Sequence, residues 1–278
     1  MSPAPFVTRF APSPTGYLHR GHAYSALTAF NAAQDAGGRF LLRIEDIDTQ
    51  RCRPHFEAAI HDDLAWLGLR WETPVRRQSE HMDDYRQALS RLSARGLVYR
   101  CFKTRAQVLD EIGRAPHGPV RAYRGEPLSP SEEARLIAEG LPYAWRLSLA
   151  EAERRLGAFS RLTFLDHGAG HVVARPELAG DVILARKDVG VAYHLAVVVD
   201  DALQGVTHVI RGADLFEATH IQRLLQALLD QPTPTYRHHC LLLGPDGKRF
   251  AKRDRAETLR DLRARGVTRQ ALRAELGV

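Results

Sequence analysis

The sequence predicts an α/β fold, in which a parallel sheet is interrupted by a smaller mixed α+β insert and followed by short C-terminal helices. Three observations lead to this prediction. Strand, loop and helix patterns alternate over residues 1–97, that rhythm is lost over 98–178 in a stretch rich in Pro, Gly and Arg, and it returns from residue 179. Alternating strands and helices are typical of parallel sheets whose faces are covered by helices.

The first part of the chain begins with a β-prone run at Val7–Phe10, followed by a Pro-, Ser- and Gly-containing loop at 11–16. Apolar residues at helical spacing then predict a helix from Gly21 that ends before Gly37. The next run, RFLLRIED at 39–46, reads as a strand that ends in acidic residues. Two further helices are predicted at 54–68 and 79–96, each closed by a glycine.

The insert, 98–178, contains a short helix near 131–139 and mixed short strands. The α/β rhythm of 179–235 includes the segments GDVILARKD, VAYHLAVVVDDAL, VTHVIRG and the helical ADLFEATHIQRLLQALLD. The C-terminal part, 236–278, holds a strand-like CLLLG, the basic glycine loop PDGKRFAKRD and a last short helix in AETLRDLRARG. We therefore divide the chain into 1–97 and 179–235 as the two halves of the sheet domain, with the insert between them.

Composition excludes several classes of protein. No apolar run is long enough to span a membrane, and the start MSPAPFVTRF lacks the basic and apolar regions of a secretory signal, so we expect a cytoplasmic protein. Three separated cysteines do not suggest a disulfide framework. The net charge of +6 fits a polyanionic partner such as RNA, although a general arginine bias explains it equally well, since only four basic residues are lysine.

The tetrad His19-Arg20-Gly21-His22 stands at the start of the first predicted helix. Two imidazoles beside the amides and positive dipole end of a helix can form an anion site, and Gly16 and Gly21 let a flat ligand approach the backbone. Alone, two histidines near a turn are more often ordinary surface residues. Lys252, in GKRFAKRD, adds a cation suited to a phosphate, although by itself that segment would read as a solvated basic turn.

Together, these features resemble the class I aminoacyl-tRNA synthetases, in which the HxGH tetrad and a later Lys-Met-Ser-Lys-type loop clamp ATP. The resemblance is closest to the glutamyl type. It is carried, in order, by RFAPSPTGYLHRGHA, LLRIEDID, LAWLGLRWE, AYHLAVVVDDALQGVTHVIRGADL and LLLGPDGKRFAKRD. It implies a Rossmann-like catalytic domain, an acceptor-type insert, and ATP and Mg²⁺ as cofactors.

The resemblance also implies roles for single residues. The catalytic residues would be His19, His22 and Lys252. The ATP-binding set would be Pro12, Gly16, His19, Gly21, His22, Arg249 and Lys252. The glutamate-binding set would be Arg9, Ala11, Ser13, Glu45, Tyr193 and Arg211, with Arg211 on the γ-carboxylate. On spacing alone, Glu45 would be a solvated strand-end acid and Tyr193 a core aromatic, whereas Arg9 and Arg211 have the geometry to hold a carboxylate through two hydrogen bonds.

The implied reaction is attack of the glutamate α-carboxylate on the α-phosphorus of ATP, which gives glutamyl-adenylate without a covalent enzyme intermediate. Only about one helix follows Lys252, so we expect no anticodon-binding domain. This architecture resembles the short members of the family, which activate L-glutamate without tRNA and transfer it to queuosine in the anticodon of tRNA-Asp. We expect these partners, no membrane and a monomer.

Three other functions stay open at this point. The chain resembles a fragment of a glutamyl-tRNA synthetase that charges a tRNA 3′ end. HxGH tetrads also serve small-molecule adenylyltransferases. The third alternative is a non-catalytic RNA-binding paralogue that has kept the fold.

Two motifs depart from the family pattern. Many relatives hold zinc with Cys-x-Cys, a Tyr and a further Cys, whereas this sequence has Cys101, Lys103 and, at the later position, Tyr123. One thiolate cannot complete a four-ligand site, so we expect no zinc, with an ion pair or packing in its place. In the basic loop, Ala251 stands where the family has serine. The His238-His239 pair reads as an ordinary strand entry rather than a metal site.

Overall fold

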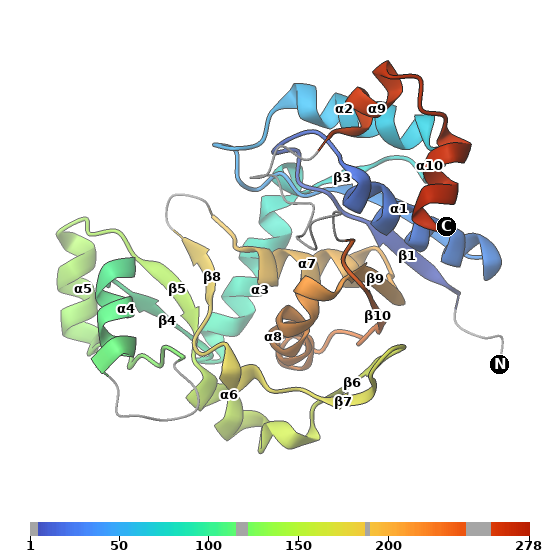
Figure 1. Ribbon diagram of the computed structural model, residues 1–278. Coiled ribbons are helices and arrows are strands. Elements are labelled where there is room, and N and C mark those ends of the chain that lie inside the picture. Colours follow the sequence, from blue (N-terminus) through green and yellow to red (C-terminus); the bar gives the residue numbers. More distant parts are fainter. Residues whose placement is uncertain (1–4, 115–121, 187–189, 243–256) are drawn as a thin grey trace.

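The computed structural model describes residues 5–114, 122–186, 190–242 and 257–278, and it confirms the α/β fold (Figure 1). One sheet has the order β1-β2-β3 and a second the order β7-β6-β10-β9, and all neighbours are parallel except β6 and β7. The strands are β1 (Val7–Phe10), β2 (Arg39–Ile44), β3 (Arg76–Arg77), β6 (Thr163–Asp166), β7 (Gly170–Val173), β9 (His208–Gly212) and β10 (Thr235–His239).

The two sheets meet at β1 and β9. Thr207, just before β9, donates its amide to the carbonyl of Val7 over 2.9 Å, and its hydroxyl oxygen accepts from the Val7 amide over the same distance. The carboxyl ends of β1, β2 and β9 therefore lie near one another, where parallel α/β sheets bind their ligands.

Helices pack around these strands. α1, α2, α9 and α10 share one apolar cluster with β1 and β2, whereas α3, α7 and α8 belong to a second cluster. Pro54 opens α2 at a position where its missing N–H costs no hydrogen bond, and Gly277, with φ of 69°, closes α10. The bounds are α1 (Arg20–Asp35), α2 (Pro54–Trp66), α3 (Met82–Ala94), α7 (Tyr193–Leu203), α8 (Phe216–Leu228), α9 (Leu259–Ala264) and α10 (Arg269–Leu276).

The insert has its own antiparallel sheet, in the order β4-β5-β8. Because β8 follows residue 178, this sheet extends past the boundary that the sequence suggested. Between β5 and β8, the β6–β7 hairpin leaves the insert and joins β10 of the main sheet. The insert elements are β4 (Val98–Cys101), α4 (Arg105–Arg114), α5 (Pro130–Ala138), β5 (Ala144–Leu147), α6 (Leu149–Leu156) and β8 (Ile183–Arg186).

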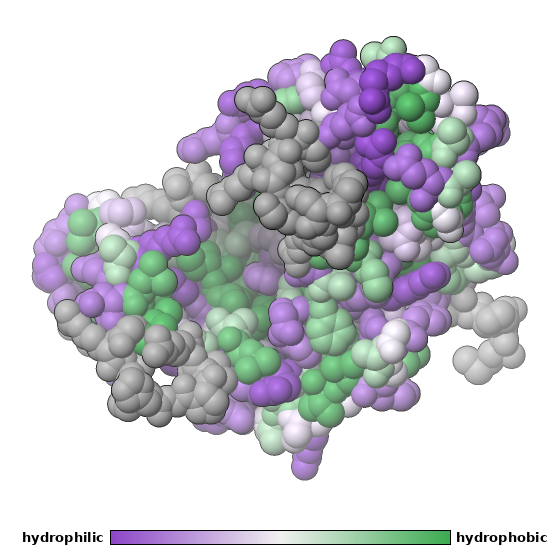
Figure 2. Space-filling view, viewed as in Figure 1, coloured by the Kyte–Doolittle hydropathy of each residue, from purple (hydrophilic) through white to green (hydrophobic). Residues whose placement is uncertain are grey.

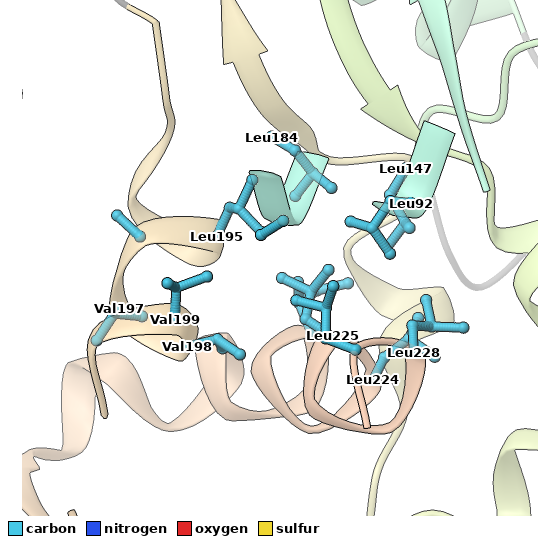
Figure 3. Close-up of a cluster of buried hydrophobic side chains, with 14 of the residues drawn as sticks. Leu92, Leu147, Leu184, Leu195, Val197, Val198, Val199, Leu224, Leu225 and Leu228 are labelled. Atoms are coloured by element: carbon cyan, nitrogen blue, oxygen red, sulfur yellow. The ribbon is translucent and has the colours of Figure 1, made fainter. Parts of the chain in front are cut away.

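The insert and the main helices share a core. In Figure 3, Leu147 of β5 and Leu184 of β8 point toward Leu92 of α3, Leu195 of α7 and Leu225 of α8. All five side chains are at most 1% exposed. Close packing of this kind resists relative movement, so the wall that the insert contributes to the ligand site is held in place.

One predicted element needs correction, and two helices were not predicted. The strand expected at CLLLG (240–244) lies earlier, as β10, and residues 240–242 are not in a strand, while 243–244 lie outside the described residues. The apolar triplet was misleading because β10 is built from mostly polar residues, of which Tyr236 is only 2% exposed. Helices α4 and α6, which the sequence analysis did not predict, lie in the insert.

None of the helices in the described part of the molecule combines the length and the apolar character needed to cross a bilayer. Figure 2 shows green, hydrophobic side chains among purple, hydrophilic ones on the visible face rather than one continuous band.

We expect Leu195→Ala in α7 to lower the free energy of unfolding by about 2–5 kcal/mol, because it opens a cavity in the shared core. Leu203 lies on the same helix but is 60% exposed, so Leu203→Ala should change that free energy by less than about 0.5 kcal/mol. Urea unfolding followed by circular dichroism would measure both. Equal losses in the two variants would contradict the shared core.

Candidate active site

A cavity of about 950 Å³ opens between the insert and the carboxyl ends of β1, β2 and β9. In Figure 2 the surface recedes between the insert and the rest of the molecule. This volume lies in the range of sites for drug-sized ligands and cofactors. The residues proposed from the sequence that line it are Arg9, Ala11, Pro12, Ser13, His22, Glu45, Tyr193 and Arg211.

The remaining proposed residues fall into two groups. Gly16, His19 and Gly21 belong to the loop and helix start beside the cavity but are not among its lining residues. Arg249 and Lys252 lie outside the described residues, so their roles stay predictions.

His19 and His22 form a reciprocal cap at the start of α1. Nδ1 of His19 accepts from the amide of Gly21 over 3.1 Å, and Nδ1 of His22 accepts from the amide of His19 over 3.2 Å. The ring centroids are 3.8 Å apart. The sequence analysis expected the amides at this helix start to contribute to an anion site, but the His19 ring itself accepts from one of them. His22 is the member of the pair that lines the cavity.

Glycine at position 21 is required by this cap. A Cβ added to Gly21 would lie 3.0 Å from Cε1 and 3.2 Å from Nδ1 of His19. Those separations are tighter than ordinary van der Waals contact, so a larger residue would displace the His19 ring. Gly21 therefore leaves room for the ring of His19, in addition to the room it leaves for a ligand.

The C-terminal helices are attached to the same turn. His19 forms a β-bridge with Thr258, and the amide of Leu259 donates to the carbonyl of Leu18 over 2.8 Å. Arg20 pairs with Glu257 over 2.8 Å and with Glu275 over 2.7 Å. The chain that follows the basic loop is thus fixed beside the tetrad, although the two are more than two hundred residues apart in sequence.

Arg9 enters the cavity from β1 and is held by Asp201 of α7. Its Nε donates to Oδ1 of Asp201 over 3.1 Å and its Nη2 to Oδ2 over 3.4 Å. Oδ1 of Asp201 also accepts from Nη1 of Arg43 over 2.8 Å. Arg9 was expected to grip a substrate carboxylate through two hydrogen bonds, but its Nε–Nη2 edge already binds Asp201 in this way.

Glu45 lies at the end of β2, beside Arg43, whose Nη2 donates to its Oε1 over 3.3 Å. Burial raises the pKa of Glu45, and the carboxylates of Asp200 and Asp201 add to this effect, while Arg43 and Arg9 oppose it. The raised pKa is mainly a desolvation effect, which further positive charge would oppose. An ammonium group bound here would supply that charge and stabilise the carboxylate.

Asp200, the neighbour of Asp201, ties α7 to another part of the fold. Its carboxylate accepts from Nε of Arg76 over 2.7 Å, from Nε2 of Gln78 over 2.8 Å and from the hydroxyl of Tyr85 over 2.9 Å. Burial, and then the adjacent Asp200 charge, raise the pKa of Tyr85. The phenol therefore stays protonated and acts as a donor.

Arg211, at the end of β9, is held by several groups. Its Nε donates to Nε2 of His238 over 3.1 Å, and its Nη2 donates to Thr219 over 2.7 Å and to Gln222 over 2.8 Å. Its Nη1 donates to the hydroxyl of Tyr193 over 3.3 Å. Because the Nε–Nη2 edge is engaged, a carboxylate can reach this guanidinium only from the Nη1 side, next to Tyr193. The expectation from the sequence was two hydrogen bonds from this guanidinium to a carboxylate, and this role stays a prediction.

Sequence reasoning missed several residues that line the cavity. Arg146 and Arg186 face it from the insert sheet, and His194 follows Tyr193 on α7. Burial and the charge of Arg211 lower the pKa of His194 to about 4, so this imidazole is neutral near pH 7. Neither arginine belongs to a sequence motif. They reach this side of the cavity only because β5 and β8 pair in the insert sheet.

The region where relatives hold zinc is packed with side chains. Sγ of Cys101 lies 3.7 Å from the hydroxyl of Tyr123, and both residues belong to a small buried cluster with Tyr99 and Val108. Lys103 pairs with Glu111 over 2.6 Å. The expected ion pair and packing are therefore present. Across the described part of the chain, no three His, Cys, Asp or Glu side chains are grouped to hold a metal, and the absence of zinc stays a prediction.

Comparison with known proteins agrees with this geometry. The glutamyl-Q tRNA(Asp) synthetase of Rhodobacter capsulatus is 46% identical over 285 residues, which cover 98% of this chain and 100% of that protein. The glutamyl-Q tRNA(Asp) synthetase of Symbiobacterium thermophilum is 45% identical over 94% of this chain and 82% of its own length.

A solved structure is similar as well. The crystal structure of a glutamate tRNA ligase from Elizabethkingia meningosepticum, in complex with its amino acid, matches with a TM-score of 0.74 and 31% identity. The match covers 90% of this chain and 52% of that one, so this chain spans about half the length of that protein. The family described as tRNA synthetases class I (E and Q), catalytic domain, matches residues 5–277, and the chain therefore belongs to this family.

Proposed function

We propose that this protein uses ATP to convert L-glutamate into glutamyl-adenylate, without tRNA, and then transfers glutamate to queuosine in the anticodon of tRNA-Asp. The observation that carries the proposal is one cavity that brings together the tetrad histidine His22, the acid Glu45 and the Arg211–Tyr193 pair. The names of the two relatives that match nearly the whole chain describe the same activity.

The amino-acid end of the cavity suits glutamate. In our proposal Glu45 binds the α-ammonium group, since its raised pKa marks a position that favours a cation. The γ-carboxylate lies against Nη1 of Arg211 and the hydroxyl of Tyr193. Glutamine offers an amide in place of that carboxylate, so it would form a weaker, uncharged contact with the guanidinium.

The nucleotide end lies at the start of α1. We propose that Mg²⁺ arrives with ATP, on its phosphates, and that His22 and Lys252 stabilise the negative charge that develops as the α-phosphorus is attacked. Pro12 and Ser13 also line the cavity. Phosphoryl transfer of this type depends on positioning and charge stabilisation rather than on covalent chemistry by the protein.

We propose that the tRNA that accepts glutamate enters along the insert. Arg146 and Arg186 stand on that wall of the cavity, which suits a partner with a phosphate backbone. An unstacked anticodon base is the kind of RNA feature that proteins read specifically. We further propose that the protein acts in the cytoplasm, where tRNA is found, and as a monomer.

We expect that incubation with labelled glutamate, MgATP and queuosine-containing tRNA, followed by RNA digestion, places the label on the anticodon nucleoside of tRNA-Asp. tRNA from cells that cannot make queuosine is the matched control and should accept no label. Label on the 3′-terminal adenosine would instead identify a synthetase that charges tRNA, and no label would favour a non-catalytic paralogue.

We expect His22→Ala to reduce glutamate-dependent ATP–pyrophosphate exchange by about 10²- to 10³-fold, the usual loss when one preorganised donor is removed. The variant should also lose some stability, because His22 accepts from the amide of His19. Thr268→Ala removes the N-cap of α10 and lies outside the cavity lining. It should lower the free energy of unfolding by about 1 kcal/mol and so controls for the loss of a helix cap. Equal exchange rates in the two variants would contradict the role of His22.

We expect Arg211→Ala to reduce the preference for glutamate over glutamine about 10- to 100-fold, since a hydrogen bond to a charged group contributes about 1.5–3 kcal/mol. Competitive exchange assays with the two amino acids would measure the ratio of kcat/KM. Arg237→Ala, at an exposed position of neighbouring β10, is the control. An unchanged ratio in Arg211→Ala would show that another group reads the γ-carboxylate.

A further inference from the structure

His238 connects the proposed glutamate site to the β6–β7 hairpin. Its Nδ1 lies 2.7 Å from Oδ2 of Asp166 on β6, and its Nε2 accepts from Nε of Arg211 on β9 over 3.1 Å. The side chains of Asp166 and His238 are each only 3% exposed. Three adjacent strands thus contribute one buried row of side chains that ends at Arg211.

The tautomer of His238 follows from the groups around its ring, which are Asp166 at Nδ1 and, at Nε2, Arg211 and the hydroxyl of Thr219 over 3.2 Å. A guanidinium only donates hydrogen bonds, so Nε2 must carry a lone pair and the ring proton must be on Nδ1, where it is donated to Asp166. Burial, and then the charge of Arg211, lower the pKa of His238 to about 4. The imidazole is therefore neutral near pH 7, in the tautomer that accepts from Arg211.

Asp166 is fixed from the other side by the hairpin turn. Its Oδ1 accepts from the amides of Gly168 and Ala169, each over 2.9 Å. Burial alone would raise the pKa of Asp166, but the hydrogen bonds from His238 and from these two amides outweigh it and lower that pKa. Asp166 therefore stays ionised and holds the proton of His238 on Nδ1.

We propose that Asp166 and His238 are positioning residues that fix the guanidinium of Arg211 with Nη1 toward the cavity, and so set the affinity for the glutamate side chain. This inference rests on the proposed function. Nη2 of Arg211 is held by Thr219 and Gln222, and His238 holds Nε, which prevents rotation of the guanidinium plane about its Cδ–Nε bond. Ligand-orienting pairs of this kind contribute to binding although they do not touch the ligand.

The test is glutamate-dependent ATP–pyrophosphate exchange with the full chain and without tRNA. We expect His238→Ala to raise KM for glutamate about 10- to 100-fold, with KM for ATP unchanged and kcat little affected. In His238→Gln the amide oxygen stands near the position of Nε2, so this variant should recover most of the affinity. The glutamine variant also keeps the proposal testable if the alanine variant does not fold.

Asp166→Asn tests the tautomer. An asparagine amide that donates to Nδ1 of His238 would move the ring proton to Nε2. Nε2 could then no longer accept the hydrogen bond from Nε of Arg211. KM for glutamate should then rise although the imidazole is still present. Because Asp166 also accepts from the hairpin amides, thermal melting of this variant would separate a loss of stability from a loss of affinity.

His239 offers a matched control. It is the next residue of β10, is 9% exposed, and packs edge-on against Tyr24 with ring centroids 4.9 Å apart, on the face of the strand opposite His238. His239→Ala should lower stability without a selective rise in KM for glutamate. If His238→Ala behaves like His239→Ala, or leaves KM for glutamate unchanged, the positioning role is wrong.

The two proposals fail separately. If the wild-type protein shows no glutamate-dependent exchange, the proposed function fails. Equilibrium dialysis with labelled glutamate alone then still compares the wild-type chain with His238→Ala. A dissociation constant that rises about 10- to 100-fold in the variant would support the positioning pair, and equal constants, or no binding by either protein, would overturn it.

Discussion

The adjacent carboxylates of Asp200 and Asp201 are the interaction on which the rest of the site depends. Asp201 binds Arg9 of β1 and Arg43 of β2, while Asp200 binds Arg76 of β3 and Tyr85 of α3. Consecutive residues of α7 thus hold three strands and a second helix. Opposite charges lower the pKa of Asp201 in spite of its burial, so this carboxylate is ionised near pH 7. Removing one member of a buried ionic group leaves its partner uncompensated, which costs about 3–5 kcal/mol.

This arrangement explains how buried charges can serve an amino-acid site. The guanidinium groups of Arg9 and Arg211 are oriented by protein acceptors before any ligand arrives, through Asp201 in one case and His238 in the other. Orienting a long side chain in advance lowers the entropy that binding must overcome. A ligand ammonium would add positive charge beside Glu45, whose pKa is raised mainly by burial.

Much of the fold was predictable, because β1, β2, α1 and α2 carry clear patterns and the two helices end shortly before a glycine. The strand β10 was not, since its buried His238 and Tyr236 look polar or ambiguous in sequence and its stability comes from pairing with β9 and β6. The tetrad identified a site at the start of α1. The partners of Arg211 could not be read from the sequence, because residues 166, 211 and 238 are brought together only by the order of the strands.

The shared core also has a consequence for how the molecule folds. Leu147 and Leu184 belong to the insert, yet they pack on Leu92, Leu195 and Leu225 of the main helices, as Figure 3 shows. Each part buries some of its apolar surface only against the other, so the stability of the insert is coupled to that of the main helices. The contacts between the insert and the main helices join segments tens of residues apart in sequence, and non-local contacts of this kind slow folding.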